Sequence, residues 1–212
     1  MNRRGILNQL DQNPLCQFAD TFLRLYGKEK VFDSELLAAE FGKFFGSIGH
    51  LRKEALIAFL KGRLGIKNIS PSDNLGVDRG INVRLAGKML VLYKIDDWDG
   101  SQEFTIIHEL RELIGYACQE VMPSFEDCSN EELENQADAF AAALLMESDD
   151  FYKNMLSSGF DPILLHKIYN KAYIAVVARM ASVLRGKNPP LALWTSVLET
   201  CNKTDQGLLR AA

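Results

Sequence analysis

Two helical segments separated by a short loop constrain this 212-residue chain more than any other feature of its sequence. Residues 104–112 read Phe-Thr-Ile-Ile-His-Glu-Leu-Arg-Glu, and residues 134–146 read Glu-Asn-Gln-Ala-Asp-Ala-Phe-Ala-Ala-Ala-Leu-Leu-Met. His108 and Glu112 lie four residues apart, so both side chains project from one face of a helix. The alanines of the second segment allow close packing on a neighbouring helix, which would bring Glu134 to the same place. The sequence therefore predicts a helix pair that meets at a group of acidic residues and a histidine.

The polar side of the first helix also has a simpler interpretation. On a helix beginning near Gln102, one apolar stripe consists of Ile106, Leu110, Leu113 and Ala117. The other side would be a solvated face made of Glu103, His108, Glu109, Arg111 and Glu112. Pairs at helical spacing, such as His108 with Glu112, often stabilise faces of this kind. Taken alone, the pattern H-E-x-x-E (HExxE) is compatible with either a metal site or a solvated helix face.

The rest of the chain predicts an α+β fold that is mostly helical. Apolar residues recur at helical spacing in segments 14–26, 34–45 and 50–62, whereas Gly80 to Lys94 shows the alternation of a β-hairpin about a glycine-containing turn. We expect a small antiparallel sheet packed with the helix pair. Predicted capping sites are the cluster from Asp96 to Ser101 before the first motif helix, and Ser129 with Glu132 before the second. Two further helices are expected at 149–157 and 162–185, the latter interrupted at Asn170 to Tyr173.

Charge and cysteine usage narrow the classes of function. The net charge of −4 provides no general basic surface, and segment 34–62 contains no basic recognition helix, so direct nucleic-acid binding is not expected. No secretory signal and no apolar stretch long enough to cross a membrane is present. The cysteines at positions 16, 118, 128 and 201 lack C-x-x-C spacing and indicate reduced thiols in a cytoplasmic protein. Cys118 and Cys128 flank the loop between the motif helices and could meet, although two separate thiols are the favoured interpretation.

The order of hairpin, first motif helix, loop and second motif helix resembles the ImmA/IrrE family of zinc metallopeptidases. That family has F-T-x-x-H-E-L-G-H on its first helix and E-x-x-A-N-x-F-A-A-x-L-L-M-P on its second. The positions that match are Phe104, Thr105, His108, Glu109, Leu110, Glu134, Ala137, Phe140, Ala141, Ala142, Leu144, Leu145 and Met146. The resemblance covers residues 76–185. It suggests an amino-terminal helical extension at 1–68, a metallopeptidase domain at 69–186, and a short helix with a tail at 187–212.

The resemblance also implies roles for individual residues. His108 would be the first metal ligand, Glu112 would take the place of the second, and Glu134 would be the third. Glu109 would be the catalytic general base of a zinc (Zn2+) metalloendopeptidase. The implied function is regulated cleavage of a protein substrate, commonly a helix-turn-helix transcriptional repressor.

The chain departs from the family pattern at four positions. Arg111 stands where Gly is usual, Glu112 where His is usual, Asp138 in place of Asn, and Glu147 in place of Pro. One imidazole and two carboxylates neutralise a dication, which weakens it as a Lewis acid and admits Mn2+ or Fe2+ alongside zinc. Arg111 paired with a carboxylate in an empty site would indicate a degenerate enzyme. The sequence thus leaves open an active peptidase and a catalytically degenerate fold that serves as a partner-binding or sensing module.

Overall fold

The computed structural model describes residues 13–85, 88–127, 129–187, 195 and 197, which belong to two compact units, Met1–Leu145 and Met146–Ala212. The elements of the first unit are α2 (Pro14–Tyr26), η1 (Lys28–Phe32), α3 (Ser34–Phe45), α4 (Lys53–Leu64), β1 (Asn68–Ser72), β2 (Gly80–Leu85), β3 (Lys88–Lys94), α5 (Asp99–Val121) and α6 (Asn130–Leu145). Those of the second are α7 (Ser148–Ser157), α8 (Pro162–Tyr169) and α9 (Tyr173–Lys187). The α+β, mostly helical fold is confirmed.

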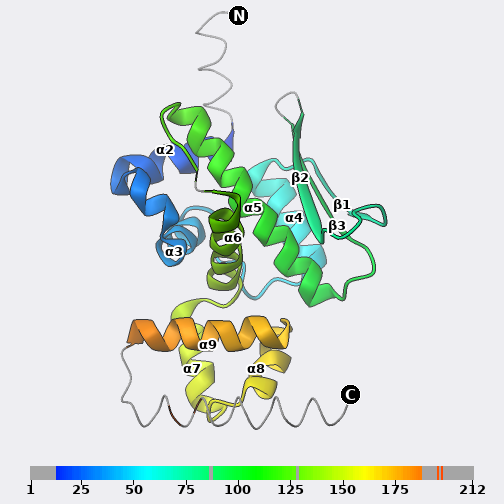
Figure 1. Ribbon diagram of the computed structural model, residues 1–212, viewed down its shortest axis with the longest axis vertical. Coiled ribbons are helices and arrows are strands. Elements are labelled where there is room, and N and C mark those ends of the chain that lie inside the picture. Colours follow the sequence, from blue (N-terminus) through cyan, green and yellow to red (C-terminus); the bar gives the residue numbers. More distant parts are fainter. Residues whose placement is uncertain (1–12, 86–87, 128, 188–194, 196, 198–212) are drawn as a thin grey trace, which may run out of the picture. The chain divides into compact units, whose positions relative to one another are not determined.

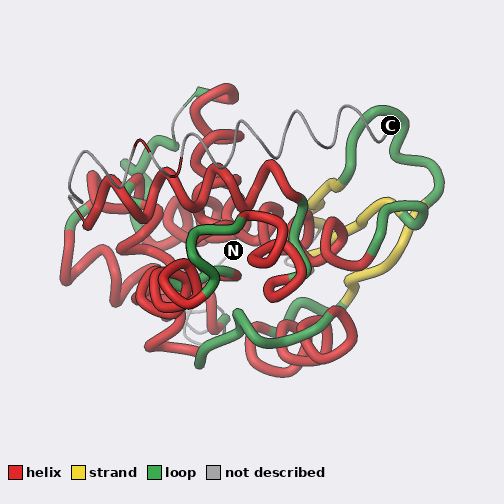
Figure 2. Tube along the Cα trace, turned by 90° about the horizontal axis from the view of Figure 1, so that it is seen from below, coloured by secondary structure: helices red, strands yellow, loops and turns green. Residues whose placement is uncertain are grey.

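The three strands form one sheet with the order β1-β3-β2, coloured yellow in Figure 2. Strands β2 and β3 pair antiparallel, with Ile81 opposite Leu92, so the predicted hairpin is confirmed, although its turn at 86–87 lies outside the described residues. Strand β1 pairs parallel to β3, so the sheet is mixed and the prediction of a purely antiparallel sheet was wrong. Strand β1 gave little signal because it contains Pro71, which is tolerated on an edge strand, and buries Ile69 alone.

Helix α5 is the central element of the first unit and lies between the sheet and α2 (Figure 1). Its predicted apolar stripe is buried from Ile106 to Ala117. The helix begins at Asp99, three residues before the predicted start, and Trp98 at the N-cap makes no side-chain capping bond. The predicted cap was therefore wrong. At α6 the predicted capping pair is present, because the Glu132 carboxylate accepts hydrogen bonds from the backbone N–H and the hydroxyl of Ser129.

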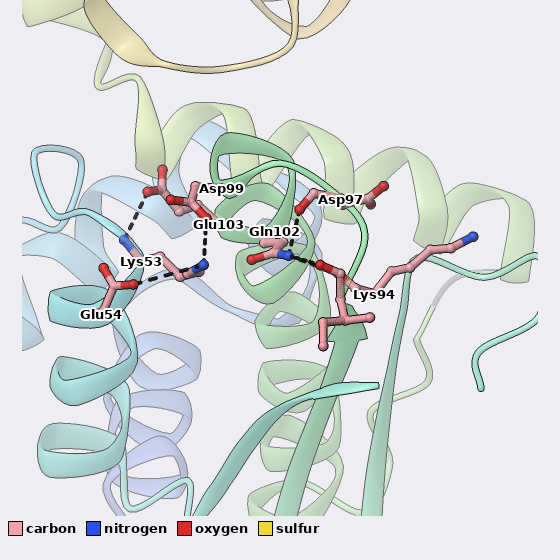
Figure 3. A network of polar contacts seen from close by, with 8 residues as sticks. Lys53, Glu54, Lys94, Asp97, Asp99, Gln102 and Glu103 are labelled. Carbon is pink, nitrogen blue, oxygen red and sulfur yellow. Dashed lines mark hydrogen bonds and ion pairs between the residues drawn. The ribbon is translucent and has the colours of Figure 1, made fainter. Parts of the chain in front are cut away.

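A polar network takes the place of a local cap at the start of α5 (Figure 3). The Gln102 amide donates to the carbonyls that follow β3, including that of Asp97 at 2.6 Å. The buried Glu103 carboxylate accepts the backbone N–H of Lys53 at 2.9 Å, which caps α4 from a distant part of the sequence. The Lys53 ammonium also pairs with Asp99 at 2.5 Å. These contacts fix α5 against both β3 and α4, and so fix the position of the helix that carries the motif.

The amino-terminal helices share one hydrophobic core with the motif helices. Helix α2 packs on α5, and α3 packs on α6. Phe18 and Phe41 are buried together, and the ring of Phe41 meets that of Phe140 edge to face with centroids 6.1 Å apart. The first unit therefore joins residues of the predicted amino-terminal extension to the two motif helices, and α6 is held between α3 and α5.

The described part of the second unit contains three helices around an apolar core, in which Phe151, Leu165 and Met180 are buried. The predicted interruption is confirmed: α8 ends at Tyr169, its C-cap Asn170 has a left-handed φ of 54°, and α9 begins at Tyr173. The predicted carboxy-terminal helix and tail at 187–212 fall almost entirely outside the described residues. Within the described chain, we find no helix that is both long and apolar enough to span a membrane.

Candidate metal centre

The structure brings together the three side chains that the family resemblance implies as metal ligands. His108 and Glu112 project from one face of α5, and α6 supplies Glu134. One donor atom from each residue lies within 4.8 Å of the other two. His108 Nε2 is 3.3 Å from Glu134 Oε2. The packing of α5 on α6 therefore assembles an imidazole and two carboxylates at one point.

Asp138 contacts the other nitrogen of the imidazole. His108 Nδ1 lies 2.9 Å from Asp138 Oδ1, one helical turn beyond Glu134 on α6. A carboxylate in this position orients a histidine ligand and fixes its tautomer, which here directs Nε2 toward Glu134. Burial lowers the pKa of His108, but the hydrogen bond to Asp138 and the charges of Asp138, Glu109 and Glu134 outweigh burial, and the net shift is upward. The site thus attracts positive charge.

The candidate centre is enclosed by α5 and open on the side of α6. The His108 side chain is 15% exposed, whereas those of Glu134 and Asp138 are 68% and 65% exposed. Structural ions are usually enclosed by four protein ligands, whereas catalytic ions keep one position open to water or substrate. Three protein donors on an accessible surface fit the second kind of site. The donor set of one imidazole and two carboxylates fits a divalent ion such as zinc.

Glu109 lies beside these donors but points toward the sheet, and it is only 6% exposed. The Asn82 amide on β2 donates to Glu109 Oε2 and to Glu112 Oε2, each at 2.7 Å. Burial raises the pKa of Glu109, the Asn82 hydrogen bond opposes that rise, and the charge of Glu112 adds to it. A raised pKa suits a carboxylate that must take up a proton near neutral pH.

Two residues of this environment, Gly80 and Asn82, were missed from the sequence. A Cβ at Gly80 would overlap Thr105 and lie 2.6 Å from Glu109 Oε1, so only glycine allows β2 to approach α5 this closely. In the hairpin pattern the apolar residues are Ile81 and Val83, which places Asn82 on the face that alternation assigns to solvent. The only available signal was the position of the hairpin directly before the motif helix.

The solvated-face interpretation of α5 was wrong for three of its residues, since Glu103, Glu109 and Arg111 are all buried. The Arg111 guanidinium faces Asp127 in the loop before α6, at 3.3 and 3.4 Å. Gly115 leaves room for this pair, because a Cβ there would overlap the Asp127 carboxylate. Among the described residues, the carboxylate paired with Arg111 is therefore Asp127 and none of the three candidate ligands.

Comparison with known proteins agrees with this arrangement. Residues 63–161 match the model of a peptidase family described as the IrrE N-terminal-like domain, which includes the sheet and both motif helices. No curated protein matches the chain significantly. Among solved structures, the chain is similar to a Mycobacterium tuberculosis transcriptional regulator, with a TM-score of 0.52, 16% identity, and coverage of 79% of this chain and 51% of that one. This chain thus spans about half the length of that protein, and the likeness shows a shared fold. The ImmA/IrrE resemblance is confirmed, since residues 63–161 match the model of the IrrE N-terminal-like peptidase family.

Proposed function

We propose that the chain is a metal-dependent peptidase in which His108, Glu112 and Glu134 hold one divalent ion and Glu109 is the general base. The main observation in support is the convergence of three donors from two helices within 4.8 Å of one another. Two further contacts support an intact site. Asp138 orients His108, and Arg111 is engaged by Asp127 outside the group of donors.

The surroundings of each side chain suggest its role in peptide hydrolysis. A divalent ion at this position would polarise the carbonyl of the scissile peptide bond. Glu109 would take a proton from the attacking water on Oε1, because Oε2 accepts the hydrogen bond from Asn82. The same carboxyl group would then protonate the leaving amine. Asp138 would hold the His108 ring in place throughout the reaction.

The donor set also bears on the identity of the ion. Two carboxylates and a neutral imidazole would bring a dication to a net charge of about zero, where the common two-histidine set leaves about +1. Carboxylate oxygens are hard ligands that suit Mn2+ and Fe2+ better than histidine nitrogens do. We therefore propose that the site holds zinc, the metal implied by the family resemblance. We also propose that it accepts Mn2+ or Fe2+ more readily than a site with two histidines does.

The substrate that we propose is a protein, and more narrowly a helix-turn-helix transcriptional repressor in the cytoplasm. The family match and the fold shared with a protein titled a transcriptional regulator support this choice. The near-zero net charge of a dication with these three ligands favours a second, non-enzymatic function. An ion neutralised by its ligands is a weaker Lewis acid, so the site would bind metal without turnover in a partner-binding or sensing module.

Glu109→Gln distinguishes these functions. The amide keeps the shape of the side chain and removes the base, so metal content should be unchanged while repressor cleavage falls by about 10²- to 10⁴-fold. Glu131→Gln, an exposed acidic residue on α6, is the matched control and should cleave at the parental rate. Metal binding without cleavage by any variant would identify the sensing module. Parental cleavage by Glu109→Gln would contradict the role of the base.

A further inference from the structure

Strand β2 presents Gly80 and Asn82 to the acidic face of α5. Residues two apart on a strand share one face, where Asn82 contacts Glu109 and the absence of a side chain at Gly80 leaves room for it. The amide nitrogen of Asn82 carries two hydrogens, and it lies 2.7 Å from Glu109 Oε2 and 2.7 Å from Glu112 Oε2. One amide group therefore joins the candidate general base to the second candidate ligand.

The shared Asn82 amide offsets a charge repulsion that is particular to the H-E-x-x-E pattern. Glu109 and Glu112 are three residues apart on α5, a spacing at which side chains on a helix are neighbours and like charges repel each other. Glu109 is almost fully buried, so water screens the repulsion poorly. A histidine at position 112 would be neutral and would not repel Glu109. The need for a donor shared by the two residues therefore arises only when both are carboxylates.

The geometry also gives the two carboxylate oxygens of Glu112 different partners. Its Oε2 accepts the hydrogen bond from Asn82, which leaves Oε1 for an ion. Glu109 is held on the side of the sheet by the Asn82 amide at Oε2, and its Oε1 lies in space that a side chain at position 80 would occupy. The two carboxylates are thereby kept in different positions, one as a ligand and one beside the ion.

We propose that Asn82 is a positioning residue that enables Glu112 to serve as a metal ligand next to Glu109. This inference rests on the proposed metal site. It makes Asn82 a specific partner of a carboxylate at position 112, so removing the amide matters much less when residue 112 is histidine.

A double-mutant cycle tests the inference, with Mn2+ alone as the probe and calorimetric titration of the full chain as the readout. The four proteins are the parent, Asn82→Leu, Glu112→His and the double variant. Loss of a residue that orients a ligand typically weakens metal binding about 10- to 100-fold, and we expect that loss for Asn82→Leu in the parent. In the Glu112→His background the same change should cost less than about 3-fold. Asn74→Leu, which alters an exposed asparagine between β1 and β2, is the control and should bind like the parent.

Thermal unfolding of the metal-free proteins shows whether each variant folds. Asn82→Thr suits a strand but is too short to reach both carboxylates, so it replaces the leucine variant if the latter does not fold. Equal losses in both backgrounds would indicate a general structural role and overturn the inference, as would no loss in the parent background. Failure of the parent itself to bind Mn2+ or Zn2+ would overturn the proposed metal site together with the role of Asn82.

Discussion

Helix α5 carries two groups of charges that differ in charge balance and in exposure to solvent. The acidic cluster, which consists of His108 and Glu112 with Glu134 and Asp138 of α6, is open to solvent on one side and has more carboxylates than cations. In the buried pair, a fully enclosed Arg111 meets Asp127, whose side chain is 15% exposed, and the two charges are matched. The first arrangement has an excess of negative charge that a cation would balance, whereas the charges of the second balance each other. Charge balance and exposure together distinguish the proposed binding site from a structural contact on the same helix.

The buried pair lies in a dry part of the first unit. Burial raises the pKa of the nearby Cys118 thiol to about 12, despite the opposing effect of Arg111. Arg111 Nε has no hydrogen-bond partner among the described residues. The guanidinium in this position therefore depends heavily on Asp127, and Gly115 is the residue that lets the two side chains meet.

Arg111→Ala should have the largest effect of the changes that test this comparison, and the effect should be on folding stability. Removal of one partner from a buried ion pair typically costs about 3–5 kcal/mol, measurable by urea unfolding. Metal affinity should change by less than about 3-fold, since Arg111 is engaged outside the acidic cluster. Arg24→Ala is the control, because Arg24 pairs with Asp20 on the surface and its loss should cost about 0–1 kcal/mol. A tenfold gain in metal affinity in Arg111→Ala would show instead that the guanidinium competes with the ion.

Asp138→Ala should have the opposite pattern: the free energy of unfolding should change little, and metal affinity should fall clearly. Its side chain is largely exposed and contacts His108, so metal affinity should fall about 10-fold or more, as expected when the partner of a histidine ligand is lost. Titration with Mn2+ and Zn2+ measures the loss, and Glu131→Ala on the same helix is the control. An unchanged affinity would remove Asp138 from the site.

The sequence predicted the helix pair, the hairpin and the shared face of His108 and Glu112 because these depend on local spacing along the chain, whereas Glu134 as the third donor came from the family resemblance. Glu109, Arg111 and Glu103 were harder to place. Amphipathic patterns assume that a polar helix face meets water, but α5 is covered on several sides by other elements of the first unit. The contact between Asn82 and Glu109 depends on how β2 meets α5, which no local pattern encodes. The parallel partner of β3 was missed for a similar reason.

The most direct test of the account is the metal content of the full chain after purification in metal-replete buffer without chelator. We predict about one divalent ion per chain in the parent and in Glu131→Ala, and none retained in Glu134→Ala, because a site built from two helices needs donors from both. Elemental analysis of the three proteins measures this directly. Equal metal content in Glu134→Ala and the parent, or no metal in either, would contradict the assignment of His108, Glu112 and Glu134 as ligands.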